Sequence, residues 1–367
     1  MSVRLTAIYH VRGDAAGIAA RARGIAVEQS VEMPVEAIDD AGVLADIVGD
    51  VQGIADLGDG MFEVRIGLAV ATTGPEAGQL FNMLFGNTSL QDDVTLHDAE
   101  LPAEVIAGFG GPNLGIAGLR ASACAVGRAM TGTALKPQGL SPAGLAALAG
   151  RMAGGGIDFI KDDHGLADQG YSPFAARVAA VAAALDRVRR ETGHRTRYLP
   201  SLSGDLDAMR AQIRMALSVG VHGFVIAPMI AGLATFDTLV REHPDCAFMT
   251  HPALSGIARI APPLFYGKLF RLLGADAVVY PNHGGRFGYS PDTCRHLAEA
   301  ARAPWGAVRP SLPVPAGGMT LARIGEMLDF YGPDTIVLIG GNLLAARERL
   351  REEAAAFVAR VAGHHFA

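Results

Sequence analysis

Cysteine is scarce in this 367-residue chain, and the three that occur, Cys124, Cys246 and Cys294, are far apart. An odd number at this spacing predicts neither a disulfide framework nor a CxxC metal site, and we expect a reduced, cytoplasmic protein. No apolar run approaches the roughly 20 residues of a membrane helix, and the first residues lack the apolar stretch of a signal peptide. No basic cluster occurs and the net charge is −6, which argues against nucleic acid and anionic membranes as partners.

Aromatic residues are also few, at 6% of the chain, whereas there are 46 glycines and the hydrophobic fraction is 50%. This composition is typical of α/β enzymes, which need many tight turns between strands and helices. A chain of this length can bury a substantial core in one large domain or in two ordinary ones.

The first third of the chain predicts a separate α+β domain, which we place at residues 1–118. Alternating apolar residues predict strands at Arg4–Val11, Val51–Leu57, Phe62–Ala69 and Asp93–Glu100. Helices are expected at Ala16–Ala26 and Pro75–Phe85, the second with Pro75 at its first position, where proline is tolerated.

The remainder, residues 119–367, alternates strand, turn and helix. Strands are predicted at Thr133–Lys136, Asp158–Lys161, Tyr198–Leu202, Gly223–Ala227, Ala247–His251, Ala277–Pro281, Leu312–Ala316 and Thr335–Ile339. Helical runs between them include Pro142–Ala153, Pro173–Glu191, Leu206–Val219 and Ala322–Tyr331. Eight such repeats in about 220 residues predict a (β/α)8 barrel. A doubly wound open sheet is the alternative, but no GxGxxG follows the first strand of a βαβ unit.

Polar residues stand at the carboxyl ends of the predicted strands, where (β/α)8 barrels carry their chemistry. They are Lys136, Lys161, Asp163, His164, Ser201, Ser203, His251, Asn282, His283 and the pairs Gly317-Gly318 and Gly340-Gly341. The agreement between barrel register and polar placement predicts an enzyme.

The segment Ile157–His164 ends an apolar strand in a lysine, two aspartates and a histidine. Lys161 and Asp163 share one side of the strand end, and Asp162 points away, because neighbouring side chains alternate. An ammonium cannot ligate a hard cation. Lys161 therefore either forms a buried ion pair with Asp163 or reacts with CO2, as a neutral amine, to give an anionic carbamate. The second reaction requires that burial lower the pKa of the lysine.

Together with Gly132–Leu140, this segment resembles the first two barrel strands of the ribulose-bisphosphate carboxylase (RuBisCO) large-chain family. The resemblance covers nearly the whole chain, through a few short motifs. It implies a ferredoxin-like α+β domain followed by a TIM barrel. It also implies a catalytic lysine at Lys136, a carbamylated lysine at Lys161, and Mg2+ held by Lys161, Asp163 and His164.

The chain departs from the carboxylases at several of their functional positions. Gln138 replaces the second lysine of their KPK motif, and His164 replaces a glutamate ligand. Mg2+ prefers oxygen ligands, so a histidine nitrogen either shifts the preference toward Mn2+ or lies outside the ligand shell. Pro252 and Val279 replace the residues that bind a second phosphate. We therefore expect a monophosphate substrate with an apolar end.

Two glycine pairs, Gly317-Gly318 and Gly340-Gly341, follow the last two predicted strands, the usual phosphate position in this barrel. The resemblance assigns His251 to polarising or protonating substrate oxygens; a structural, hydrogen-bonded histidine is the alternative. Arg286, in the glycine-rich loop after the sixth barrel strand, corresponds to a lid lysine of the carboxylases that contacts the added CO2, and its permanent charge suits a phosphate or enolate oxygen. Glu28 and Asn87 resemble residues supplied to the partner subunit's site, which implies a homodimer with intersubunit active sites.

These features predict a RuBisCO-like isomerase rather than a carboxylase. We expect metal-dependent enolisation that converts 5-methylthioribulose 1-phosphate into 1-methylthio-xylulose and 1-methylthio-ribulose 5-phosphates, in methionine salvage. Alternatives are a 2,3-diketo-5-methylthiopentyl-1-phosphate enolase, a decarboxylase or transcarboxylase of an oxidised branched-sugar phosphate, and a non-catalytic phospho-ligand sensor. The joint presence of Lys136, Lys161, Asp163 and His251 argues against the sensor.

Overall fold

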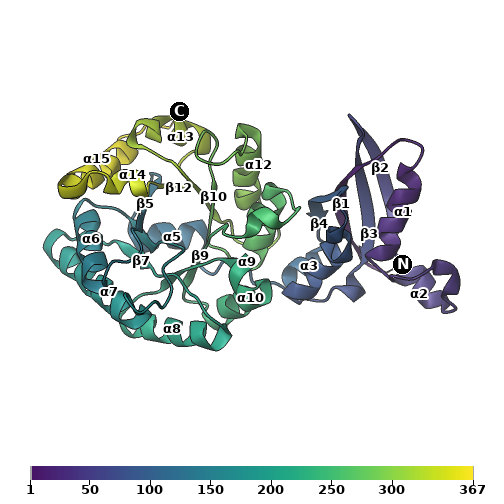
Figure 1. Cartoon of the computed structure of the whole chain (residues 1–367), viewed down its shortest axis with the longest axis horizontal. Coiled ribbons are helices and arrows are strands. Elements are labelled where there is room, and N and C mark those ends of the chain that lie inside the picture. Colours follow the sequence, from purple (N-terminus) through teal and green to yellow (C-terminus); the bar gives the residue numbers. More distant parts are fainter. Residues whose placement is uncertain (1, 367) are drawn as a thin grey trace. The chain divides into compact units, whose positions relative to one another are not determined.

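The structure, a computed structural model, describes residues 2–366 and divides into two compact units (Figure 1). The first unit comprises Met1–Gly110, Ser255–Phe265 and Trp305–Val308, and the second comprises Gly111–Leu254, Tyr266–Pro304 and Arg309–Ala367. The predicted boundary at residues 118 and 119 falls inside helix α5 (Gly115–Ala123) of the second unit. Residues 1 and 367, the outer limits of the two predicted domains, lie outside the described residues.

The first unit contains a four-stranded antiparallel sheet in the order β2-β3-β1-β4. Its strands are β1 (Arg4–Arg12), β2 (Asp50–Gly58), β3 (Met61–Ala69) and β4 (Val94–Glu100), and its helices are α1 (Ile18–Glu28), α2 (Ala41–Asp46), α3 (Ala77–Phe85) and α4 (Ala103–Ala107). The sequence β1-α1-β2-β3-α3-β4 with this strand order is the expected ferredoxin-like arrangement. Leu5, Tyr9 and Ile66 of the central strands are fully buried, because the helices cover their side chains.

Helix α3 begins two residues later than the proline predicted. The residue before it is Glu76, whose carboxylate accepts hydrogen bonds from the N–H groups of Gly78 (2.7 Å) and Gln79 (2.6 Å). A helix start leaves such N–H groups unpaired, and an acidic side chain satisfies them. Pro75 therefore precedes the helix and is not its first residue.

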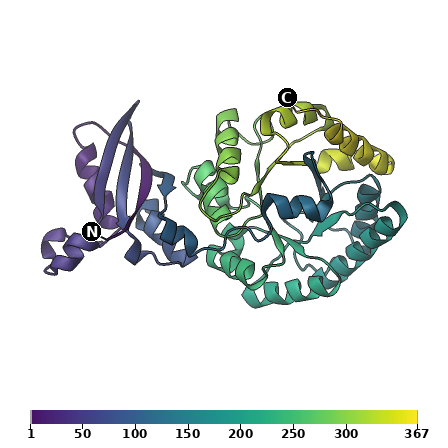
Figure 2. The same cartoon turned by 180° about the vertical axis from the view of Figure 1, so that it is seen from behind.

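The second unit is a (β/α)8 barrel, as predicted. Its strands are β5 (Met130–Leu135), β6 (Phe159–Asp162), β7 (Arg197–Leu199), β8 (Gly223–Ile226), β9 (Ala247–Thr250), β10 (Ala277–Pro281), β11 (Leu312–Ala316) and β12 (Ile336–Leu338). They pair in parallel as β12-β5-β6-β7 and β8-β9-β10-β11. A bridge between Ser201 and Val225 joins β7 to β8. The hydroxyl of Thr335 donates to the carbonyl of Pro313 (3.0 Å) and ties β12 to β11, so the ring is closed (Figures 1 and 2).

Helices surround the ring of strands (Figure 2). They are α6 (Pro142–Gly154), α7 (Phe174–Thr192), α8 (Leu206–Ser218), α9 (Pro228–Ala231), α10 (Leu233–Glu242), α11 (Phe270–Leu272), α12 (Pro291–Arg302), α13 (Ile324–Tyr331), α14 (Gly341–Leu344) and α15 (Leu350–Ala362). Within residues 2–366, no helix combines the length and apolar character that crossing a membrane requires.

The barrel interior is a packed apolar core, to which α5 adds Ile116, Leu119 and Ala123. Helix α5 lies at the amino-terminal ends of the strands. Asp276, directly before β10, holds the start of α5 there. Its carboxylate accepts hydrogen bonds from the N–H groups of Leu114 and Gly115 (both 2.7 Å). One end of the barrel is thus covered by an apolar helix, and the polar residues gather at the other end.

Candidate active site

Lys136 and Asp163 meet at the carboxyl ends of β5 and β6. Leu135 lies opposite Asp162 in the parallel pairing, so the residues that follow them are brought side by side. The ammonium of Lys136 donates to Oδ1 of Asp163 in a close ion pair. The Lys136 side chain is 36% exposed, so this lysine is not desolvated. Its partner is a carboxylate at the open end of the barrel.

Lys161 has the buried environment that Lys136 lacks. The residue is 3% exposed, and its Nζ donates to the backbone carbonyl of Asp162 at 2.8 Å. Burial lowers the pKa of Lys161 to about 8, with a further contribution from the positive charge of Lys136 and against the attraction of Asp163. Among residues 2–366, the ion-pair partner of Asp163 is Lys136 and not Lys161. A substantial fraction of the Lys161 amine is neutral near pH 8, as carbamate formation requires.

His164 and His251 stack beside this pair, with ring centroids 4.2 Å apart and planes at 7°. Nδ1 of His164 lies 3.4 Å from Oδ1 of Asp163. Nδ1 of His251 accepts the N–H of Ala253 at 3.1 Å, so the neutral ring carries its proton on Nε2. Burial, aided by the positive charge of Lys161, lowers the pKa of His251 to about 2. His251 is therefore a neutral hydrogen-bond donor and not an imidazolium acid.

Asp163 is ionised despite its burial. Burial alone raises its pKa, but hydrogen bonds from His164 and Lys136 and the nearby lysine charges outweigh that effect and hold the pKa well below its usual range. Within residues 2–366 no group of three or more His, Cys, Asp and Glu side chains suits a metal ion. Asp163 and His164 thus require a further ligand, and a carbamate on the adjacent Lys161 fits that need. A cation bound to Asp163 would compete with Lys136 for the same carboxylate.

Asp162 points away from the site, as predicted, into a buried polar network. Its Oδ2 accepts from Nε of Arg177 at 3.0 Å, and its Oδ1 accepts from the hydroxyl of Tyr198 at 2.7 Å. All three residues are buried. The network ties the end of β6 to α7 and β7. Sequence reasoning missed Arg177, whose signal is a charged residue on a helix face that is otherwise apolar, with Val178 and Val181.

Arg286 lies against the first glycine pair. Its N–H donates to the carbonyl of Gly317 at 3.1 Å, and a Cβ on Gly318 would lie 3.2 Å from Cγ of Arg286. Gly317 and Gly318 have φ values of +94° and +86°, a region that L side chains rarely adopt. The two glycines therefore permit both the loop shape and the close approach of Arg286.

The second glycine pair faces Lys136. A Cβ on Gly340 would lie 4.0 Å from Cε of Lys136. The side-chain amide of Asn342 donates to the carbonyl of Met319 at 2.7 Å and so links the loops after β12 and β11. In the described part of the chain, the backbone N–H groups of both glycine pairs are unused by other protein groups. They remain available to an anion.

Glu28 and Asn87 belong to the first unit and lie apart in sequence but together in space. The side-chain amide of Asn87 donates to Oε1 of Glu28 at 3.0 Å. The buried Gln29 holds them in place, since its amide donates to the carbonyl of Met83 (2.8 Å) and its oxygen accepts the N–H of Thr88 (3.1 Å). Gln29 is a positioning residue that the sequence did not reveal.

Of the two residues expected to face an apolar substrate end, only Pro252 is partly open, directly after His251. Val279 is 4% exposed and packs in the barrel core beside Val314. The side chain of Val279 points into the barrel from the middle of β10, so Pro252 is the more accessible of the two residues.

A ferredoxin-like unit followed by a barrel with lysines and a carboxylate at its carboxyl end defines the class of RuBisCO-type barrel proteins. The sequence model of one protein family, the ribulose bisphosphate carboxylase large chain, catalytic domain, matches residues 115–349 of this chain. The chain is 65% identical over 364 residues to a 5-methylthioribulose-1-phosphate isomerase of Rhodospirillum rubrum. The aligned region covers 99% of this chain and 97% of that protein.

The chain is also 31% identical over 289 residues to a 2,3-diketo-5-methylthiopentyl-1-phosphate enolase of Geobacillus kaustophilus. This aligned region covers 76% of this chain and 70% of that protein. Among solved structures, a Rubisco-like protein from Rhodopseudomonas palustris superposes with a TM-score of 0.93 at 49% identity, over 100% of both chains. The chain belongs to the RuBisCO large-chain family.

Proposed function

We propose that the protein is a RuBisCO-like isomerase that converts 5-methylthioribulose 1-phosphate into 1-methylthio-xylulose and 1-methylthio-ribulose 5-phosphates, a reaction of methionine salvage. The observation that carries this proposal is the identity with the Rhodospirillum rubrum isomerase over nearly the full length of both chains. The gathering of Lys136, Lys161 and Asp163 at one barrel end supports it. Gln138 and His164, at positions where the carboxylases have a lysine and a glutamate, support proton transfer without addition of CO2.

Lys136 is the leading group for proton transfer along the carbon chain of the substrate. Its Nζ is paired with Asp163 and partly exposed, so the ammonium can donate a proton to the substrate, and the neutral amine left behind can accept the next proton. Nε2–H of His251 donates a hydrogen bond to the substrate oxygen on which negative charge develops. Arg286 contributes a second positive group, and the N–H groups of the two glycine pairs bind the phosphate.

Lys161 as a carbamate, Asp163 and His164 are the residues that would hold Mg2+, or Mn2+ if the histidine nitrogen is a ligand. A cation at this position supplies polarisation of the substrate carbonyl and its neighbouring hydroxyl, which makes the α-proton more acidic. The lowered pKa of Lys161 supports carbamylation, and the ionised Asp163 supports cation binding.

We also propose that the active form is a homodimer in which Glu28 and Asn87 of one subunit complete the site of the other. Their direct hydrogen bond and the Gln29 clamp hold both polar groups at one place on the first unit. The family resemblance of these two segments supports a role across the dimer.

The test is phosphorus and proton NMR of the protein with Mg2+ or Mn2+ and bicarbonate, acting on 5-methylthioribulose 1-phosphate in D2O. We expect new 5-phosphate signals and deuterium on the carbon chain. Lys136→Met should slow the exchange by at least about a hundredfold, whereas Arg295→Gln, in an exposed ion pair with Asp292 on α12, should leave it unchanged. Exchange without new products would redirect the search to the enolase and decarboxylase substrates. Absence of both exchange and product would overturn the isomerase proposal.

A further inference from the structure

A cavity lies at the opposite end of the barrel from Lys136 and Asp163. Its volume is about 510 Å³, within the range of small-molecule sites. Its lining includes the first residues of four successive strands, namely Phe159 of β6, Arg197 of β7, Gly223 of β8 and Ala247 of β9. Because Phe159 begins β6 and Asp163 follows its end, the length of the strand, roughly 13 Å, separates the cavity from the candidate active site.

One part of the cavity wall is apolar. Leu119 of α5, Leu185 of α7 and Val221 before β8 contribute to it. These side chains offer a surface for the hydrocarbon part of a ligand and cannot bind its charged part. The polar groups of the cavity decide which charge it accepts.

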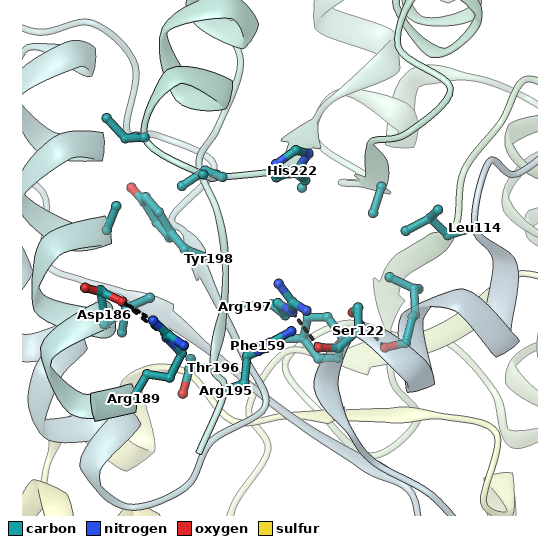
Figure 3. A pocket seen from close by; sticks show the side chains of 18 of the residues that line it. Leu114, Ser122, Phe159, Asp186, Arg189, Arg195, Thr196, Arg197, Tyr198 and His222 are labelled. Carbon is teal, nitrogen blue, oxygen red and sulfur yellow. Dashed lines mark hydrogen bonds and ion pairs between the residues drawn. The ribbon is translucent and has the colours of Figure 1, made fainter. Parts of the chain in front are cut away.

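Two neighbouring arginines supply the positive charge. Nε of Arg197 donates to the backbone carbonyl of Ser122 at 2.6 Å, the contact drawn as a dashed line in Figure 3. This bond orients the guanidinium and leaves its two Nη groups without a hydrogen-bond acceptor among residues 2–366. Arg195, two residues earlier, has no ion pair or hydrogen bond from its side chain in the same range.

The electrostatics of Arg197 are those of an uncompensated cation. Burial lowers the pKa of the Arg197 guanidinium, and the positive charge of Arg195 lowers it further. The third arginine of the lining, Arg189, is instead paired with Asp186, 2.8 Å away, a carboxylate that also pairs with Arg190. The other lining carboxylate, Asp245, is exposed and forms no ion pair with Arg195 or Arg197. An anion that bound both guanidinium groups would remove this repulsion.

We propose that this cavity is a second ligand site, which binds an organic phosphate monoester through Arg195 and Arg197. A phosphate dianion matches two adjacent guanidinium groups in charge and presents oxygens that suit their forked N–H groups. The apolar wall then contacts the organic remainder. A monocarboxylate matches only one of the two charges, and inorganic phosphate leaves the apolar wall unused.

The test is isothermal titration of the full-length protein with phenyl phosphate and, separately, with inorganic phosphate at low ionic strength. We expect Arg195→Gln/Arg197→Gln to bind one equivalent of phenyl phosphate fewer per chain than the unmodified protein. Counting equivalents makes the result independent of any phosphate bound at the candidate active site. Arg295→Gln, which removes an arginine from an exposed ion pair elsewhere on the barrel, should bind like the unmodified protein.

Arg195→Gln alone guards against a folding defect, because this exposed side chain has no partner to lose. It should weaken phenyl phosphate binding at this site at least about tenfold. Equal stoichiometry and affinity in the unmodified protein and the double variant would overturn the proposal. Inorganic phosphate binding as tightly as phenyl phosphate would overturn the assignment to an organic monoester.

Discussion

At the scale of single residues, the two lysines of the site differ through their surroundings. Lys161 is buried and donates to a backbone carbonyl, whereas Lys136 is partly exposed and paired with Asp163. Desolvation penalises the charged amine, so the pKa of Lys161 falls to about 8. The neutral amine that carbamate formation requires is therefore available at Lys161, the residue for which we propose carbamylation.

The pH dependence of carbamate formation follows from this shift. Below the pKa of about 8, the neutral fraction of Lys161 rises about tenfold per pH unit, and above it the fraction levels off. At constant dissolved CO2, the initial rate at which the carbamate carbon signal appears in 13C NMR with labelled CO2 should follow that curve between pH 6 and 9, because only the neutral amine attacks CO2. Lys161→Arg should abolish the signal and Lys136→Arg should retain it. An initial rate of formation that keeps rising toward pH 10 would contradict the lowered pKa.

At the scale of secondary-structure elements, the end of β6 is fixed by a buried ion pair with α7. Arg177 donates to Asp162 through Nε (3.0 Å) and to the carbonyl of Ser172 through Nη1 (2.6 Å). Lys161 and Asp163 are the neighbours of Asp162 in the chain. The ion pair therefore fixes the backbone positions from which both of these side chains extend. Arg177 is a positioning residue for the candidate site.

Removal of this cation should destabilise the fold strongly. Arg177→Met leaves the Asp162 carboxylate buried without its ionic partner, which costs about 3–5 kcal/mol in the free energy of unfolding. The double variant Asp162→Asn/Arg177→Met should recover part of that loss. Arg190→Gln, on the same helix with a side chain 64% exposed, should cost less than about 1 kcal/mol. Urea denaturation of the four proteins measures these differences, and equal midpoints for Arg177→Met and Arg190→Gln would refute the role of the buried pair.

Elements were predictable where the local pattern is complete. Strands β10 and β11 have the predicted bounds, Ala277–Pro281 and Leu312–Ala316. Strand β7 ends at Leu199, three residues before the predicted end at Leu202. Beyond it, the isolated bridge between Ser201 and Val225 makes the contact with β8. The predicted helix at Ala322–Tyr331 begins as a 3-10 turn, Leu321–Arg323, before α13. These ends depend on tertiary hydrogen bonds that no periodicity contains.

At the scale of the whole molecule, the chain does not divide at a single point. Residues Ser255–Phe265, from the middle of the barrel sequence, belong to the first unit. The N–H of Leu96 donates to the carbonyl of Arg259 (3.0 Å), and the N–H of Ala261 donates to the carbonyl of Leu96 (2.9 Å). This segment thus completes the hydrogen bonding of β4. A strand-by-strand reading of the sequence gives no sign of it.

The proposed intersubunit site predicts complementation between two inactive variants. In a mixed dimer of Glu28→Gln and Lys136→Met chains, one site combines an intact barrel with an intact first unit, and the other site carries both changes. Random pairing should therefore restore about a quarter of the unmodified activity, measured on co-expressed chains with two tags. Glu28→Gln mixed with Asn87→Ala should restore none, because both changes lie in the first unit. Complete inactivity of the first mixture would contradict a shared site.

The sequence by itself determined the two-part architecture, the barrel register and the polar residues at the strand ends, because strand period and polar strand ends are local properties. The roles expected of Glu28, Asn87 and Arg286 came only from the family resemblance. Only the tertiary structure decided that Asp163 pairs with Lys136, that His251 is neutral, and that Val279 belongs to the core. It also revealed Arg177 behind the site and the arginine cavity at the far end of the barrel. Pairing, burial and pKa depend on which distant segments the closed ring brings into contact, and a linear pattern does not contain those distances.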